Sequence, residues 1–126
     1  MRTEYHLVKA ARFERTMSKL DYDDDYETLI EDYLLASAHL INAILHTKKI
    51  LKEDKDIKHN QLFEFLKKDA VSLEFHDILS DLIQQLEQLR PSYVYGKGEN
   101  GNTARKAESV FKEIKDICDR ILSKNR

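Results

Sequence analysis

Apolar residues recur every three or four positions along most of the chain, which is the period of helices that bury one face. The pattern predicts helices over about residues 5–19, 26–51, 60–68, 72–89 and 102–122. Only three glycines and one proline are present, which leaves few residues for the turns of a β fold. We therefore expect an all-α fold, an antiparallel bundle of four to five helices in a single domain over residues 1–126.

The second predicted helix differs from the others because neither of its faces is charged. Its expected core stripe consists of Tyr26, Tyr33, Ser37, Leu40, Ile41 and Ile44. The opposite face carries Leu35, His39, Asn42, His46 and Ile50. Residues 33–46 include no Asp, Glu, Lys or Arg, yet the run is too short to span a membrane. Either this helix is central, or its outer face meets a second subunit. We expect the latter, a homodimer interface made by Leu35, His39, Asn42 and His46.

Composition limits the classes of function. The chain has 126 residues and a formal net charge of −2, so nucleic acid would need a local basic patch. Cys118 is the single cysteine, which excludes an internal disulfide and a cysteine zinc site. Neither an apolar signal core at the N-terminus nor an apolar run of membrane-spanning length occurs. We expect a cytoplasmic protein without a membrane partner.

Unlike chemical groups converge after the fourth predicted helix. Pro91 is expected to end that helix at Arg90, and Tyr93 and Tyr95 follow, ahead of a glycine-rich loop over residues 96–101. The arginine can interact favourably with the negative end of the helix dipole. Alternatively, it can bind phosphate while the tyrosines stack on bases. The loop enters a helix N-terminus, which favours anions, but it also reads as a mobile connection.

The histidines have both structural and chemical interpretations. His39 and His46 are two helical turns apart, about 10.5 Å along the axis, which is too far for one metal ion. We therefore expect no metal and no cofactor. They can be hydrogen-bonded interface residues, or one can bind phosphate or act in catalysis. In the turn over residues 56–60, Asp56 or Asn60 can cap a helix, or His59 can reach a groove.

One face of the first predicted helix is basic. It carries Arg2, Lys9, Arg12, Arg15 and Lys19. Such a stripe can be a solvated helix face, and it can also steer a polyanion toward the protein.

The second helix, over residues 33–46, and an arginine near the end of a later helix resemble the HEPN family of small helical bundles, which commonly dimerise. The resemblance covers about residues 26–122. Family members that are ribonucleases carry an arginine, four to six residues and then a histidine, and both residues face the dimer cleft in metal-independent RNA cleavage. The resemblance also implies a nucleotidyltransferase-type protein as a possible partner.

The catalytic motif of the family is broken in this sequence. Arg90 matches the arginine, but Tyr95 stands where the histidine is expected at the four-residue spacing, and Gly96 and Lys97 stand at the longer ones. Cleavage through the 2′-hydroxyl needs a general base near neutral pH, and a tyrosine with an ordinary pKa of about 10 is a poor one. Arg90, His39 and His46 are the remaining catalytic candidates.

Three functions follow as hypotheses. The first is a catalytically degenerate HEPN-like module that binds a nucleotide, RNA or a protein partner as a homodimer. Its expected ligand-binding residues are Arg90, Tyr93, Tyr95, His39 and Asn42. The second is a metal-independent, toxin-like ribonuclease with a displaced histidine. The third is a structural homodimer or adaptor without a ligand.

Overall fold

The computed structural model describes residues 1–68, 72–94 and 100–124, and for residues 91–94 and 100 it describes the backbone alone. The elements in chain order are α1 (Thr3–Met17), α2 (Tyr26–Thr47), the 3₁₀ turn η1 (His59–Gln61), α3 (Leu62–Lys67), α4 (His76–Val94) and α5 (Asn100–Ser123). These residues contain no β-strand. The expected all-α helical bundle is therefore confirmed.

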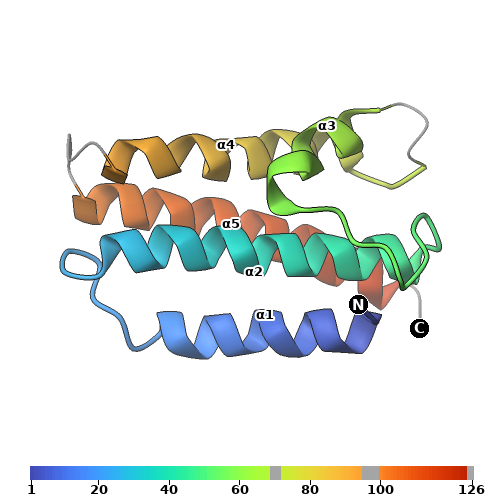
Figure 1. Cartoon of the computed structure of the whole chain (residues 1–126), viewed down its shortest axis with the longest axis horizontal. Helices are drawn as coiled ribbons and strands as arrows, with labels where there is room; N and C mark the ends of the chain where they lie inside the picture. The colour runs from blue at the N-terminus through green and yellow to red at the C-terminus, as the bar shows by residue number, and fades with distance from the viewer. Residues whose placement is uncertain (69–71, 95–99, 125–126) are drawn as a thin grey trace.

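Helix α2 is the central element, since α1, α4 and α5 all pack against it (Figure 1). Helix α1 runs antiparallel to α2, so the beginning of α1 lies beside the end of α2. Nearly all of α2 from Leu29 to His46 is buried within the chain. The uncharged residues 33–46 are therefore shielded from solvent largely by other helices of the same chain, without a second subunit.

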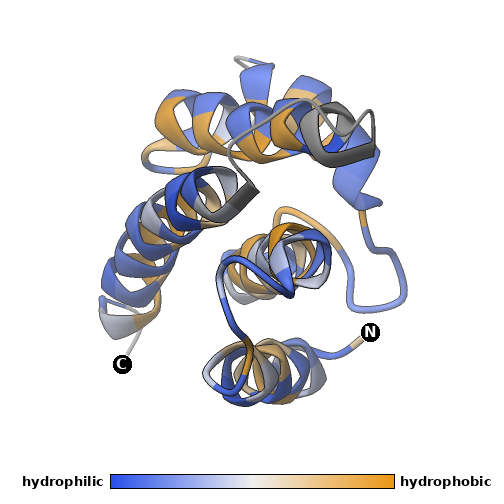
Figure 2. Cartoon of the chain, turned by 90° about the vertical axis from the view of Figure 1, so that its left-hand side faces the viewer, coloured by the Kyte–Doolittle hydropathy of each residue, from blue (hydrophilic) through white to orange (hydrophobic). Residues whose placement is uncertain are grey.

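The core lies where the apolar stripes of the helices meet, and orange residues gather on the facing sides of the helices in Figure 2. Burying one leucine or isoleucine side chain in this core stabilises the fold by roughly 1.5–3 kcal/mol. The largest fully buried side chains are Leu29, Ile30, Leu34, Ile41, Ile44, Leu45, Leu62, Leu66, Leu79, Ile83, Leu86 and Ile114.

Two helix ends differ from the sequence-based prediction because a non-glycine residue adopts a left-handed conformation. Lys49 has φ 59°, and α2 ends at Thr47 instead of continuing to residue 51. Phe75 has φ 65°, and α4 starts directly after it instead of at residue 72. A left-handed residue interrupts the helical hydrogen-bond pattern. Lysine and phenylalanine seldom adopt this conformation, unlike glycine or asparagine, so the sequence did not predict it.

The predicted helix end at Arg90 is wrong, because α4 continues through Pro91 to Val94. Proline has no N–H, so position 91 cannot donate to the carbonyl four residues earlier, and the helix ends three residues later. The glycine-rich loop predicted over residues 96–101 lies mostly outside the described residues. Among the helices that are described, none combines the length and the apolar character needed to cross a bilayer.

Candidate functional site

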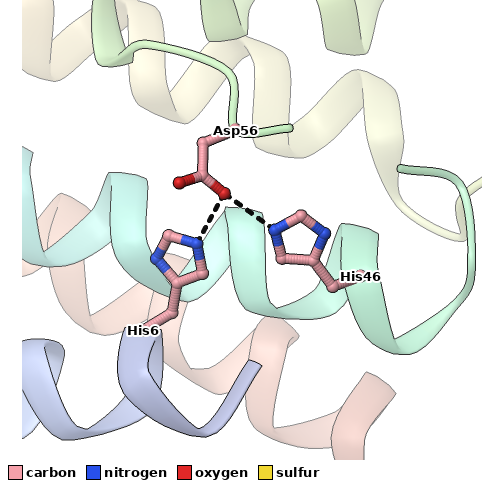
Figure 3. Close-up of side chains that lie close together, drawn as sticks. All are labelled: His6, His46 and Asp56. Carbon is pink, nitrogen blue, oxygen red and sulfur yellow. Dashed lines mark hydrogen bonds and ion pairs between the residues drawn. The ribbon is translucent and has the colours of Figure 1, made fainter. Parts of the chain in front are cut away.

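A cluster of polar side chains forms where the beginning of α1 meets the end of α2 (Figure 3). Asp56 comes from the segment between α2 and η1, and its Oδ1 lies 2.9 Å from Nε2 of His6 and 2.8 Å from Nε2 of His46. The side chains of His6 and His46 are buried, whereas that of Asp56 is 36% exposed. Two imidazoles from different helices thus share one carboxylate oxygen.

Local contacts hold these groups in place. The Asn42 side chain donates a hydrogen bond to the Ile57 carbonyl and accepts one from the Ile57 amide, which fixes Asp56 beside α2. The Nδ1 atom of His46 lies 3.2 Å from the Leu51 carbonyl. The Met1 amino group also contacts the Asp56 carboxylate, at 3.1 Å from Oδ2. One expectation for this turn was that Asp56 caps a helix. In the structure its carboxylate contacts histidines instead.

His39 extends the cluster along α2. Its Nδ1 lies 2.9 Å from Nδ1 of His6, and its ring stacks on that of Phe13 with centroids 6.0 Å apart. Burial lowers the pKa of His39 to about 4, and the charges of His6 and Lys9 add to this shift. Burial also lowers the pKa of His6, although Asp56 opposes the change. His39 is therefore a neutral imidazole at neutral pH.

The Asp56 carboxylate is strongly stabilised as an anion. Burial alone would raise its pKa, but hydrogen bonds from His46 and His6 outweigh burial and lower the pKa to about 2. The cluster accordingly keeps a fixed negative charge between two imidazoles.

Two hollows lie next to each other here, because His39 lines one, Phe13 lines the other, and their rings stack. The first has a volume of about 170 Å³. Its walls are formed by His6, Leu35, Ala38, His39, Asn42, Asp56, Ile57, Lys58 and His59. The second has a volume of about 200 Å³ and is lined by Lys9, Arg12, Phe13 and Thr16. We call this surface the α1–α2 groove, defined by Lys9, Arg12, Phe13, His39, Lys58 and His59.

Arg90 lies in a separate ionic network. Its Nε donates to Glu31 at 2.9 Å, and one terminal nitrogen lies 3.5 Å from Glu87. The other oxygen of Glu87 lies 2.6 Å from Nδ1 of His59, which also borders the groove. Arg90 is one-third exposed and is linked through Glu87 to His59, whereas His39 and His46 belong to the Asp56 cluster. Glu31, on α2, is a partner that the sequence reasoning missed.

The remaining expected site residues have different outcomes. Asn42 and His46 are buried inside the chain, while Leu35 and His39 are only half-buried. The side chain of Tyr93 and all of Tyr95 lie outside the described residues. Of the expected ligand-binding residues, His39 and Asn42 border the groove.

Among the described residues, the set that could hold a metal ion joins His46 to His6 and Asp56, and not to His39, with which it was compared in the sequence. His6, His46 and Asp56 place one ligand atom each within 4.8 Å of the others. Asp56 lies 50 positions from His6 in the chain, so no local spacing rule relates them. One indication of this site is present in the sequence, which is that His6 lies near the start of the first helix. If the first two helices pack antiparallel, that position lies beside the end of the second helix, where His46 is.

A third hollow, of about 240 Å³, lies between α1, α2 and α5. In it, the hydroxyl groups of Tyr22 and Tyr33 both donate to Oε2 of Glu108, at 2.5 and 3.0 Å. The two hydroxyl groups and the carboxylate therefore meet one another's hydrogen-bonding requirements, which indicates a structural role for this arrangement.

Comparisons with protein-family models, with curated proteins and with solved structures found no significant match to this chain. Its function is therefore inferred from the residues and their geometry.

Proposed function

We propose that this chain is an HEPN-like module that binds single-stranded RNA or a nucleotide without cleaving it, and that it acts as a homodimer. The observation that carries the proposal is the composition of the α1–α2 groove. Its two hollows are lined by three rings, those of Phe13, His39 and His59, and by the cations of Lys9, Arg12 and Lys58. Unpaired bases stack on aromatic and imidazole rings, and lysine and arginine neutralise the phosphates.

The same residues favour binding over catalysis. A histidine whose pKa is lowered to about 4, as that of His39 is, accepts a proton poorly at neutral pH. Arg90, the family's expected phosphate-stabilising group, is engaged by the carboxylates of Glu31 and Glu87. Both features weigh against the ribonuclease hypothesis.

Fluorescence anisotropy with a short labelled single-stranded RNA tests the proposal. We expect the double variant Lys9→Ala/Arg12→Ala to bind about tenfold more weakly, with a salt dependence of log K reduced by about 0.7 for each lost phosphate contact. The matched control is Lys106→Ala/Arg120→Ala, which removes the same charges from exposed positions on α5.

Three outcomes separate the hypotheses. Equal weakening by both double variants would reduce the effect to net charge and contradict the groove. Absence of RNA and nucleotide binding by the wild type would favour the adaptor hypothesis. Cleavage of the labelled RNA in the presence of chelator, abolished by Arg90→Ala, would favour the ribonuclease.

A further inference from the structure

The two buried histidines point the same ring atom at the same oxygen. Nε2 of His6 and Nε2 of His46 lie 2.9 and 2.8 Å from Oδ1 of Asp56 (Figure 3). These three atoms lie within 4.8 Å of one another. The cluster therefore presents two imidazole nitrogens and one carboxylate oxygen, converging from three segments of the chain.

The contact of His46 with the Leu51 carbonyl depends on which of its nitrogens carries a proton. The Leu51 carbonyl can only accept, so Nδ1 of His46, 3.2 Å away, has to carry a proton for that hydrogen bond to form. In a neutral ring, Nε2 then has only a lone pair, yet it faces a carboxylate oxygen at 2.8 Å. Two acceptors at that distance repel each other unless a positive species, a second proton or a metal cation, is bound between them.

His6 is held in a similar way. Its Nδ1 lies 2.9 Å from Nδ1 of His39, so one of these two nitrogens donates to the other. When His6 is the donor, its Nε2 also directs a lone pair toward Asp56. Metal-binding histidines in proteins commonly donate their second ring N–H to such a partner, which orients the ring and sets the tautomer.

We propose that His6, His46 and Asp56 form a binding site for a divalent transition-metal ion, Zn²⁺ in the first place. Zinc binds imidazole nitrogen and carboxylate oxygen readily, and three protein ligands leave a fourth position open. Tetrahedral zinc needs ligand atoms about 3.3 Å apart, so the carboxylate has to move away from both imidazoles, and the two Nε2 atoms, which lie within 4.8 Å of each other, have to adopt the same spacing. The partly exposed side chain of Asp56 permits its movement.

The cations near the site compete with the metal. The Met1 amino group contacts the Asp56 carboxylate, and Lys9 acts electrostatically on His39.

The first test is calorimetric titration of the untagged, chelator-treated full chain with Zn²⁺, followed by thermal unfolding. We expect about one ion per chain and, at a hundredfold excess over Kd, an increase in Tm of roughly 5–10 °C. Asp56→Asn keeps the shape of the side chain but removes the charge, and it should weaken binding at least about tenfold. His76→Gln is the control, since His76 is a half-buried histidine bonded to the Leu66 carbonyl, and it should bind like the wild type.

A second measurement does not depend on whether a variant folds. X-ray absorption of the zinc-loaded wild type should show two imidazole ligands in the first coordination sphere. The proposal is overturned if the wild type binds no stoichiometric zinc, if Asp56→Asn binds like the wild type, if His76→Gln loses binding equally, or if the absorption spectrum lacks imidazole ligands. The cluster would then be a hydrogen-bond network filled by protons. None of these measurements involves RNA, so they stand independently of the proposed function.

Discussion

The Asn42 side chain and the Ile57 backbone exchange two hydrogen bonds. Nδ2 of Asn42 donates to the Ile57 carbonyl at 3.0 Å, and Oδ1 accepts from the Ile57 amide at 2.9 Å. The same Nδ2 also donates to the Ala38 carbonyl within α2. The Asn42 side chain thus satisfies both backbone groups of Ile57, as a neighbouring strand does in a β-sheet. Because Asp56 precedes Ile57, these two hydrogen bonds also hold Asp56 at the site.

Replacing Asn42 with leucine should destabilise the protein by about 2–4 kcal/mol, because the amide and the carbonyl of Ile57 both lose their partner. Urea unfolding followed by circular dichroism measures the change. Asn60→Leu, at an exposed position, serves as the control and should stay within about 0.5 kcal/mol of the wild type. Similar losses in both variants would contradict a structural role of the exchange.

Glu108 should make stability depend on acidic pH. Burial alone would raise its pKa, but hydrogen bonds from Tyr22 and Tyr33 lower it below the ordinary 4.5. A carboxyl with a lower pKa in the folded state stabilises the fold above its unfolded pKa, and this contribution is lost as the pH falls through the folded pKa.

The difference in unfolding free energy between wild type and Glu108→Gln should therefore be on the order of 1 kcal/mol at neutral pH. It should shrink as the pH is lowered from about 6 to about 3. Glu113→Gln, an exposed position on the same helix, should show no such trend. A difference that is independent of pH would rule out the linkage.

Two buried serines should respond oppositely to alanine. Ser37 Oγ is buried in α2 and has no hydrogen-bond partner among the described residues, so Ser37→Ala should leave stability unchanged or raise it by up to about 1 kcal/mol. Ser80 Oγ donates to the Phe63 carbonyl at 2.8 Å, so Ser80→Ala should cost about 1–2 kcal/mol. Equal effects in chemical denaturation would show that the hydrogen bond is not the cause.

Cys118 should be inert in the folded protein. Its side chain is fully buried in α5, and burial raises the pKa of the thiol, so almost no thiolate is available to react. We expect labelling by a thiol reagent to proceed only as fast as the protein unfolds and to be complete in urea. Stoichiometric labelling on mixing with the native protein would contradict this burial.

The homodimer prediction depends on the part of the α2 face that remains accessible. Because Leu35 is half-buried, Leu35→Glu should convert the protein to a monomer in sedimentation experiments without loss of helix content. Ile78→Glu adds the same charge to α4 at a residue that is 50% exposed, and it should leave the assembly unchanged. A wild type that sediments as a monomer at all concentrations would end the dimer proposal.

The sequence by itself was sufficient for the number and approximate location of the helices, because helical periodicity is a local property. It also singled out α2 as unusual, since an uncharged run has to be covered. From the sequence we expected its outer face to meet a second subunit, whereas in the structure α2 is central and α1, α4 and α5 pack against it. The sequence also missed the left-handed residues Lys49 and Phe75 and the continuation of α4 through Pro91, because packing overrides the local preferences of these residues.

The candidate site depended on tertiary structure. Sequence spacing compared His39 with His46, which share one helix, and correctly placed them too far apart for one ion. Only the antiparallel packing of α1 on α2 brings His6 to that helix, and only the Asn42–Ile57 pairing brings Asp56 to both. Contacts between residues 50 positions apart follow from how whole helices dock. Docking is decided by the complete core, and no local pattern of residues records it.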